Sequence, residues 1–533
     1  METLRKVDGL KTVIFVILAA VLVAGLALPG CGGEVKPPPV LYIFEGGKIN
    51  VGIAGELNST VGAMQWAGAL LAQEEINRNG GVDIGGVRYI VELIPIETGE
   101  ETADPTGLTG VANLTATIDN VDFILGGSRA EAVRVYRDVA MQRGVIFISC
   151  GAGAEVLQHS VVDDYSGYRF WFNGMPCNEY FSGQTVVRIL AAVATKLREE
   201  MGVPSDYALN ATMVADNLPW AYSQVVIISQ LLAGINVNLI RAPYWVDAAG
   251  KTAEIENVLT SIASLDPQFI IPVLSGNAGV IYDVLRISCV PNAMSVGINV
   301  MAQLKAPWGG GNLTRALPNG PACANEVVLD TWAEGLQQTE KTARFLEAVL
   351  NLTGEYPLSG AATYDALLDL KAAIEAVAWY DAGKGAGCAW VDDIIKWFED
   401  PSNARVTTAG VSAYYPRPGT KAAGKPALTE AQVGSLYDLG SYNYTYTYDA
   451  RDWTTAPHTA HDLVYGPGRL TGIGAQWQWD EGAGQWKKVG VWPMYFGDEY
   501  DEALTDQYGC WNFAYNGTES LVIPQNVIAH HKP

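Results

Sequence analysis

The stretch of sequence that decides the fold is residues 48–82, KINVGIAGELNSTVGAMQWAGALLAQEEINRNGGV. Its first seven residues are mostly apolar, as in a buried strand, and residues 61–79 carry apolar side chains at helical spacing. Asn79, Gly80 and Gly81 tolerate the left-handed conformation in which many helices end. The stretch therefore predicts a strand, a turn and a helix in succession.

The same alternation of strand and helix continues along the chain. It runs from residue 48 to about 155, and a second alternation runs from Ser182 to about residue 300. Such alternation gives a parallel sheet covered by helices on both faces. We therefore predict an α/β fold of two doubly wound, Rossmann-like lobes. Residues 474–493 alternate large apolar and polar side chains around a turn, which predicts a β-hairpin in a β-rich C-terminal extension.

Length and charge narrow the class of protein. The chain has 533 residues, of which 49% are hydrophobic, and a formal net charge of −23. Domains usually hold about 100–200 residues, so a chain of this length is expected to contain more than one lobe. A strongly acidic chain lacks the basic footprint that nucleic acid requires, so we expect no nucleic-acid partner.

The N-terminus has the pattern of an export signal. Arg5, Lys6 and Lys11 precede an apolar run over residues 12–28, and small residues then lead to Cys31. This arrangement resembles a lipoprotein signal over residues 1–31, in which Cys31 is lipidated. A retained membrane helix is the alternative, since about 17 residues is near the lower limit for a span. Both interpretations place the rest of the chain outside the cytoplasm, anchored to the membrane through a tether over residues 32–47.

Exported chains often carry disulfides and glycans. Six cysteines remain beyond Cys31, and an even number favours disulfides. They are Cys150, Cys177, Cys289, Cys323, Cys388 and Cys510. About fifteen connectivities are possible, and our interpretation pairs sequence neighbours (150–177, 289–323 and 388–510). Asparagines in the Asn-x-Ser/Thr pattern are glycan candidates, with chance as the alternative: Asn58, Asn113, Asn210, Asn312, Asn351, Asn443 and Asn516.

Two glycine-containing loops follow predicted strands of the first lobe. Gly127 and Ser128 follow one strand, and Gly151, Ala152 and Gly153 follow the next. Ligands of doubly wound sheets bind at the carboxyl ends of strands, and helix N-termini offer N–H groups to anions. The two loops therefore predict a carboxylate cradle that needs no cationic side chain. The alternative is that the glycines only turn the chain.

The chain resembles the type I periplasmic binding proteins, most closely the leucine/isoleucine/valine-binding family, which are receptors of ABC importers. The resemblance runs from about residue 48 to residue 380 and is most specific over residues 48–82 and 123–157. Tyr364-Asp365-Ala366, at the start of a long helix, also resembles the family. The resemblance implies two lobes joined by three crossings, with a small solute held between them.

The resemblance also implies roles for individual residues. Ser128 falls at the family's carboxylate-binding serine, and Gly151 and Gly153 fall where the family uses Ala and Thr. Trp220 falls at the aromatic lid from the second lobe. Ser275 and Asn178 lie at further strand ends that face the cleft.

Asn299 stands where the family usually carries an acid that pairs with the ligand ammonium. A buried ammonium without an anion is costly, so the ligand is expected to be an amide, a carboxylic acid or a polyol unless Glu155 or Glu179 supplies the charge.

The resemblance, together with the two loops, implies a solute-binding protein of an ABC transporter. We expect a monomer that delivers its solute to permease subunits, with no catalytic residues, metal or cofactor. Three alternatives remain. The first is a surface receptor that senses its ligand. The second is a surface protein that binds carbohydrate through Trp477, Trp479, Trp486 and Trp492, and the third is a secreted metal-dependent hydrolase that uses His458, His461 and Asp462.

The expected lobe boundaries follow the two alternations. Residues 48–172 and about 302–380 are predicted to form the first lobe. Residues 173–301 and about 381–500 are predicted to form the second lobe, and residues 501–533 a C-terminal tail.

Overall fold

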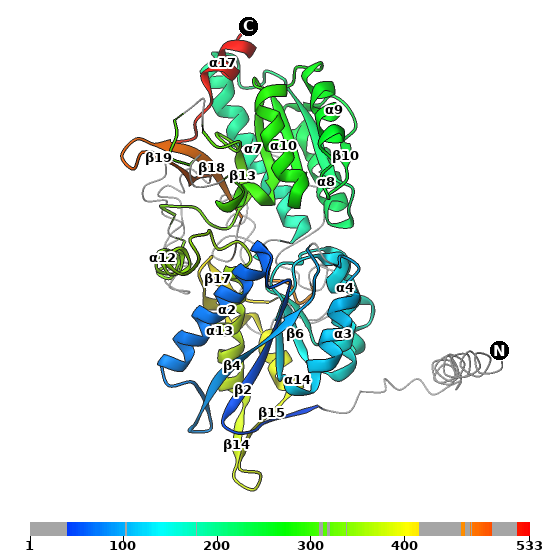
Figure 1. The fold of residues 1–533 in the computed structure, drawn as a ribbon, viewed down its shortest axis with the longest axis vertical. Coiled ribbons are helices and arrows are strands. Elements are labelled where there is room, and N and C mark those ends of the chain that lie inside the picture. The colour runs from blue at the N-terminus through cyan, green and yellow to red at the C-terminus, as the bar shows by residue number, and fades with distance from the viewer. Residues whose placement is uncertain are drawn as a thin grey trace, which may run out of the picture. The chain divides into compact units, whose positions relative to one another are not determined.

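The computed structural model describes residues 40–101, 104–176, 178–308, 313–316, 320–336, 338–414, 460–463, 470, 472–492 and 520–533. These residues belong to one compact unit that begins at Pro39. Two α/β lobes make up this unit, each built on its own sheet (Figure 1). The predicted α/β fold with two doubly wound lobes is confirmed.

The first lobe is built on a six-stranded sheet with the order β3-β4-β2-β5-β6-β7. Neighbouring strands are parallel except for β3 and β4. The strands are β2 (Lys48–Gly55), β3 (Val82–Ile84), β4 (Val87–Glu97), β5 (Phe123–Gly126), β6 (Ile146–Ser149) and β7 (Trp171–Asn173). The helices of this lobe are α2 (Thr60–Arg78), α3 (Leu108–Thr117), α4 (Ala130–Arg143), α5 (Glu155–Asp163), α6 (Tyr165–Tyr168), α12 (Thr342–Thr353), α13 (Gly360–Val377) and α14 (Val391–Phe398). Helix α2 packs along α13, and α3 packs along α4 (Figure 1).

The second lobe is built on an eight-stranded sheet. Its order is β10-β8-β11-β12-β13-β18-β19, and β9 also pairs with β8. The strands are β8 (Leu209–Asp216), β9 (Val237–Leu239), β10 (Tyr244–Val246), β11 (Phe269–Leu274), β12 (Met294–Asn299), β13 (Val327–Asp330), β18 (Ile473–Asp480) and β19 (Gln485–Trp492). The helices are α7 (Glu179–Met201), α8 (Pro219–Leu231), α9 (Thr252–Ala263), α10 (Gly276–Cys289) and α17 (Gln525–His531). The predicted hairpin at residues 474–493 is therefore the antiparallel edge of this sheet.

Two small sheets complete the described structure. A three-stranded sheet has the order β1-β15-β14, with β1 (Leu41–Phe44), β14 (Trp379–Asp381) and β15 (Ala386–Trp390). Strands β16 (Arg405–Val406) and β17 (Val411–Ser412) form a two-stranded sheet. Phe44 and Ala389 belong to the same buried core as strands β2, β5 and β6, so the three-stranded sheet is part of the first lobe.

The lobe boundaries differ from the sequence-based expectation in two places. Residues 327–330 were expected in the first lobe, but they form β13 between β12 and β18 in the second sheet. Residues 386–398 were expected in the second lobe, but β15 and α14 pack into the first core. Strand β13 joins the second sheet through backbone pairing with strands distant in sequence, which local periodicity does not encode.

The chain crosses between the lobes three times. Strand β7 belongs to the first sheet, whereas α7, which starts six residues later, packs in the second core. The chain returns between β13 and α12. It crosses again between Asp462, which forms a bridge with Asn173 of β7, and β18 of the second sheet.

The predicted disulfides are not formed. Cys150, Cys289, Cys323 and Cys388 are free thiols, so the interpretation that pairs sequence neighbours is wrong. Cys289 packs at the edge of the cluster between α9 and α10, whereas Cys323 is buried in a separate cluster with Trp308 and Trp477. Their placement in different clusters explains why this pair does not form.

Several expectations concern the ends and the surface of the chain. Cys31, Cys177 and Cys510 lie outside the described residues, as do Asn312, Asn443 and Asn516. Across the described ranges, none of the helices combines the length and the hydropathy needed to span a bilayer. At one predicted glycan site, Asn113 Nδ2 donates to the Glu97 carbonyl at 2.8 Å, so this side chain is already engaged within the protein.

Gly68→Ala is expected to destabilise the first lobe by about 1–3 kcal/mol. A Cβ atom on Gly68 in α2 would lie 1.9 Å from the Gly360 carbonyl oxygen in α13. Because the obstacle is backbone, the two helices would have to separate. Urea unfolding measures the loss. Glu74→Ala, at an exposed position of the same helix, is the control and should change stability by less than about 0.5 kcal/mol. Equal effects of the two substitutions would show that the helices can adjust without cost.

Candidate ligand-binding site

A cavity of about 250 Å³ lies at the carboxyl ends of strands from both sheets. From the first lobe it is lined by the loops after β5 and β6 and by the start of α13. From the second lobe it is lined by the starts of α7, α8 and α10 and by the residues that follow β12 and β13. This is the position at which doubly wound sheets hold ligands. Ligand pockets for drug-sized molecules hold about 300–1,000 Å³, so this cavity suits a smaller solute.

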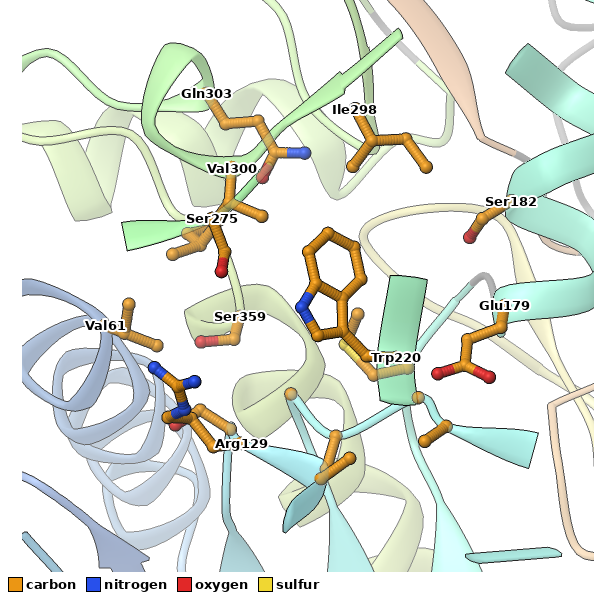
Figure 2. Close-up of a pocket in the computed structure, with 18 of the residues that line it drawn as sticks. Val61, Arg129, Glu179, Ser182, Trp220, Ser275, Ile298, Val300, Gln303 and Ser359 are labelled. Carbon is orange, nitrogen blue, oxygen red and sulfur yellow. The ribbon is translucent and has the colours of Figure 1, made fainter. Parts of the chain in front are cut away.

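The structure brings six of the nine predicted ligand-binding residues to this cavity. They are Ser128, Gly151, Ala152, Gly153, Trp220 and Ser275. Figure 2 shows the indole of Trp220 projecting among the lining side chains, with Ser275 on one side and Glu179 on the other. Trp220 is in the first turn of α8, where Pro219 starts the helix. An aromatic side chain at this place offers a large apolar surface to a ligand.

Gly127, in contrast, shapes the loop and does not line the cavity. Its φ angle is +77°, and a Cβ there would lie 2.8 Å from both Tyr136 Oη and Val133 Cγ2. Its carbonyl accepts a hydrogen bond from Gln65 Nε2 at 3.0 Å. Gly127 therefore allows the chain to turn and does not contact a ligand in the cavity. This is the alternative role considered for the glycines of these loops.

Asn178 and Asn299 are also placed outside the lining. Asn178 caps α7 by accepting from the Phe181 N–H, and its Nδ2 donates to Asp462 Oδ2 at 2.7 Å. Asn299 is fully buried, and its Nδ2 donates to Asp283 Oδ2 at 2.8 Å. Its neighbour Ile298 lines the cavity instead. An acid missing at position 299 therefore says nothing about the charge of the ligand.

Two acids that the sequence analysis missed occupy the donors of Ser128. The Ser128 N–H donates to Glu100 Oε1 at 3.1 Å, and the Ser128 hydroxyl donates to Glu101 Oε1. Tyr136 Oη donates to Glu100 Oε2 at 3.0 Å. Glu100 and Glu101 follow β4, which neighbours β2 in the sheet, and this position after a predicted strand was the available signal.

Burial controls the ionisation of these carboxyls. Desolvation, with repulsion from Glu101, raises the pKa of Glu100 to about 7, and desolvation also raises the pKa of Glu101. In the second lobe, desolvation raises the pKa of Asp216 to about 7, although the N–H and hydroxyl of Ser275 both donate to its Oδ2 at 2.9 and 2.5 Å. The hydroxyls of Ser128 and Ser275 are thus both paired with carboxyl groups of the protein.

Glu100→Gln is expected to reduce the loss of stability that accompanies rising pH. The Glu100 carboxyl has a pKa of about 7 when folded and 4.5 ordinarily, so the folded state binds more protons between these values. Its contribution is fully present below about pH 4.5 and is lost as pH rises through 7, an effect on the order of 2–3 kcal/mol. Thermal unfolding at about pH 5 and pH 8 measures the difference. Glu92→Gln, at an exposed acid, is the control, and identical pH dependence in all three proteins would contradict the expectation.

The remaining charges of the cavity are mostly negative. Glu101, Glu131, Glu179 and Asp330 line it together with the guanidinium of Arg129. Arg129 Nε lies 4.0 Å from Glu131 Oε2, and Ser223 Oγ donates to Glu179 Oε2 at 2.6 Å. Asp330 forms an ion pair with Lys488, which is 1% exposed behind it. Across the described lining residues, acids outnumber the one cation.

Several buried polar atoms of the lining have no hydrogen-bond partner among the described residues. They include Gln224 Oε1, Ser359 Oγ and Glu131 Oε1, and the residues Gln224 and Ser359 are only 4% and 7% exposed. Gln224 Nε2 donates to the Trp220 carbonyl at 3.1 Å. Exchanging the amide oxygen and nitrogen would bring two oxygens together, so this contact fixes Oε1 as the unpaired atom.

No family model and no curated protein matches the chain. Its structure is nevertheless similar to those of several solved proteins. A putative branched-chain amino acid ABC transporter protein from Silicibacter pomeroyi is 16% identical with a TM-score of 0.57, over 85% of this chain and 98% of that one. A solute-binding protein from Rhodopseudomonas palustris BisB5, in complex with 3,4-dihydroxybenzoic acid, is 11% identical with a TM-score of 0.56, over 84% and 96%. The substrate-binding protein of a Streptococcus pneumoniae branched-chain amino acid transporter, in complex with isoleucine, is 16% identical with a TM-score of 0.53, over 83% and 99%.

The chain has the type I periplasmic binding protein fold. The predicted resemblance is confirmed at the level of the fold. Because the sequence identities are low, these structures do not indicate which solute this chain binds.

The histidines considered as metal ligands have structural contacts. His461 is fully buried and stacks on Phe172, with ring centroids 4.1 Å apart. Its Nδ1 lies 2.8 Å from the Trp171 carbonyl and its Nε2 lies 3.0 Å from Glu399 Oε1. His458 lies outside the described residues. His461 therefore holds the segment around Asp462 against the first lobe.

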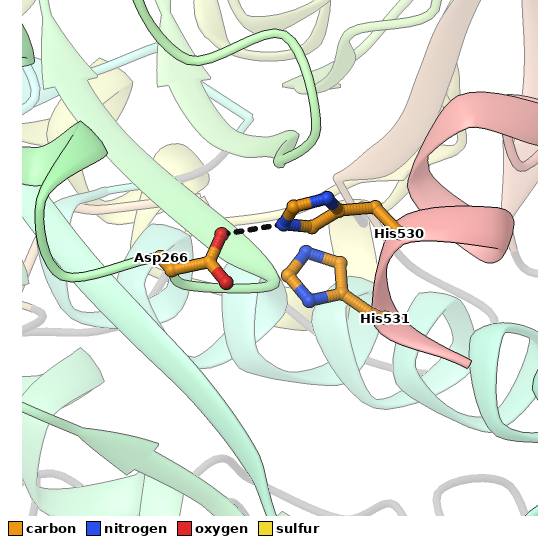
Figure 3. A group of neighbouring side chains, drawn as sticks. All are labelled: Asp266, His530 and His531. Carbon is orange, nitrogen blue, oxygen red and sulfur yellow. Dashed lines mark hydrogen bonds and ion pairs between the residues drawn. The ribbon is translucent and has the colours of Figure 1, made fainter. Parts of the chain in front are cut away.

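A second histidine cluster joins the C-terminal helix α17 to the second lobe (Figure 3). His530 Nε2 lies 2.8 Å from Asp266 Oδ1. Both ring nitrogens of His531 are engaged, with Gln268 Nε2 at 2.9 Å and the Asn292 carbonyl at 2.9 Å. A metal ion would have to displace one of these contacts. The geometry therefore favours a role in docking α17.

Proposed function

We propose that this protein is an extracytoplasmic solute-binding protein of an ABC transporter. In this proposal a small solute is captured between the two lobes and delivered to permease subunits in the membrane. The protein is a monomer anchored through lipidated Cys31, and binding involves no covalent chemistry. The observation that carries the proposal is the cavity of about 250 Å³ at the carboxyl ends of both sheets, with apolar walls and a few convergent polar groups.

The two lobes explain how binding would be signalled to a permease. A ligand that contacts Ser128 and Gly153 from one lobe and Trp220 from the other gains contacts when the lobes close. Such a ligand shifts the population toward the closed form. Neighbours of this fold that hold isoleucine or 3,4-dihydroxybenzoic acid support a small solute of similar size.

Two of the four hairpin tryptophans are closed to a carbohydrate, and Trp479 and Trp492 are partly buried against the adjoining cores. Trp477 and Trp486 are 0% and 2% exposed, and their indole N–H groups donate to the Ala302 and Arg315 carbonyls. They pack in the core beside Tyr356 and Trp308, so their faces are not available to a sugar.

A broad ligand screen tests the proposed function. Purified protein is examined by native mass spectrometry and thermal shift with amino acids, aromatic acids, amides, amines and sugars. A solute at about 100 times its Kd should stabilise the protein by roughly 2.7 kcal/mol. A screen in which no compound class binds would overturn the proposal.

A further inference from the structure

We infer that the cavity selects a small amine or amide with an apolar body and rejects the matching carboxylate. This inference rests on the proposed function and names the solute class for the same cavity. Three observations support it: the donors of Ser128 are already occupied, acids outnumber the cation in the lining, and buried acceptors lack a donor.

The first observation is that acids of the protein already accept the hydrogen bonds of Ser128, which the sequence predicted for a ligand carboxylate. Glu101 accepts the Ser128 hydroxyl and Glu100 accepts the Ser128 N–H. In the neighbouring loop the Ala152 N–H donates to Ser149 Oγ at 3.2 Å. A ligand carboxylate at Ser128 would therefore have to displace Glu101 from the hydroxyl and would meet the Glu100 carboxyl group at the N–H. The loop geometry predicted for an anion is present, but the carboxyl groups of Glu100 and Glu101 occupy the Ser128 donors.

The second observation is the balance of charge around the indole. Arg129 is the one cationic side chain among the described lining residues, and Glu131 already lies 4.0 Å from it. Its charge also lowers the pKa of Glu101 and of Asp216, although burial has the larger effect and raises both. The charge of this one guanidinium is thus already partly balanced by several carboxyl groups of the protein. A ligand anion would meet a net negative wall, whereas an ammonium would gain from the acids and from the face of Trp220.

The third observation is that the lining contains buried hydrogen-bond acceptors to which no donor is bound. Gln224 Oε1 and Glu131 Oε1 are buried without a hydrogen-bond partner among the described residues. Gln224 is 4% exposed, and its orientation is fixed by the contact of Nε2 with the Trp220 carbonyl. An amine or amide N–H satisfies such atoms, and a carboxylate oxygen does not. Ile298, Val300 and Leu329 supply the apolar surface for the body of the ligand.

The test uses two matched sets that differ only in the head group. The first set is benzoate, benzamide and benzylamine, and the second is 3-methylbutanoate, 3-methylbutanamide and 3-methylbutylamine. Isothermal titration at about pH 7.5 measures each Kd on the purified protein. We expect an amine or amide of at least one set to bind at least tenfold more tightly than its carboxylate counterpart. If compounds bind but neither set shows this preference over its carboxylate, the inference is overturned and the proposed function is left standing.

Two variants separate the inference from a loss of folding. Glu101→Ala frees the Ser128 hydroxyl and removes a negative charge, so it should gain at least tenfold in affinity for the carboxylates. Gln224→Leu keeps the side-chain size and removes the unpaired acceptor, so it should lose affinity for the amines. Glu74→Ala, on the outer face of α2, is the control and should bind as the parent protein does.

The remaining outcomes are also decisive. If none of the six compounds binds while another class in the broad screen does, the inference is wrong and the proposed function stands. If no compound of either panel binds, both fall. Failure of Glu101→Ala to gain carboxylate affinity, in a variant that unfolds at the parent temperature, would show that the acids do not set the selectivity.

Discussion

Lys488→Met is expected to lower the free energy of unfolding by about 3–5 kcal/mol. The Lys488 ammonium is 1% exposed, forms an ion pair with Asp330, and donates to the Gln303 carbonyl at 2.6 Å. Methionine retains most of the side-chain volume but leaves the Asp330 carboxylate buried without its cation. An uncompensated buried charge is among the most destabilising changes available to a folded protein. The midpoint of urea unfolding measures the effect.

The neighbouring lysine provides the matched control. Lys487 is 25% exposed and pairs with Asp480 at 2.7 Å on the hairpin, so Lys487→Met should cost less than about 1 kcal/mol. Combining Lys488→Met with Asp330→Asn should restore much of the stability, because both charges then leave the interior together. A Lys488→Met protein as stable as the Lys487→Met protein would mean that water reaches Asp330.

The fold was predictable where one element could be recognised from its own residues. Residues 48–54 and 61–79 predicted β2 and α2 closely, and residues 474–493 predicted the hairpin of β18 and β19. The partner of that hairpin was not predictable. Strand β13 has only four residues, Val327–Asp330, and it joins β18 across more than 140 residues of sequence. Pairing of this kind depends on the assembled sheet, so the expected lobe boundaries failed there.

The candidate site shows the same limit at the level of side chains. The loops that carry Ser128 and Gly153 were located correctly because strand ends of a doubly wound sheet meet at one edge. The acceptors of the Ser128 N–H and hydroxyl are Glu100 and Glu101, which lie in another loop. No local pattern around Ser128 indicates these two contacts. At the end of β12, adjacent side chains point to opposite faces, so Ile298 lines the cavity while Asn299 is buried behind it.

Trp220→Ala is expected to weaken binding of the best ligand from the screen by about thirtyfold, which corresponds to about 2 kcal/mol. The indole lies among residues of both lobes in the cavity and is the largest side chain that the second lobe places there. Its removal leaves a ligand with less contact on closure, so the closed form loses its advantage. Isothermal titration measures the Kd, and thermal unfolding without ligand shows that the variant still folds.

A second tryptophan of the same lobe makes this expectation specific. Trp245 on β10 is 39% exposed, packs edge-on against Tyr222 with ring centroids 5.0 Å apart, and does not line the cavity. Trp245→Ala should therefore leave the Kd within about twofold of the parent value, although it removes the same side chain. Trp220→Phe should retain much of the affinity, because an aromatic face remains. If Trp220→Ala and Trp245→Ala bind equally well, the solute does not contact the indole and the cavity between the lobes is not the binding site.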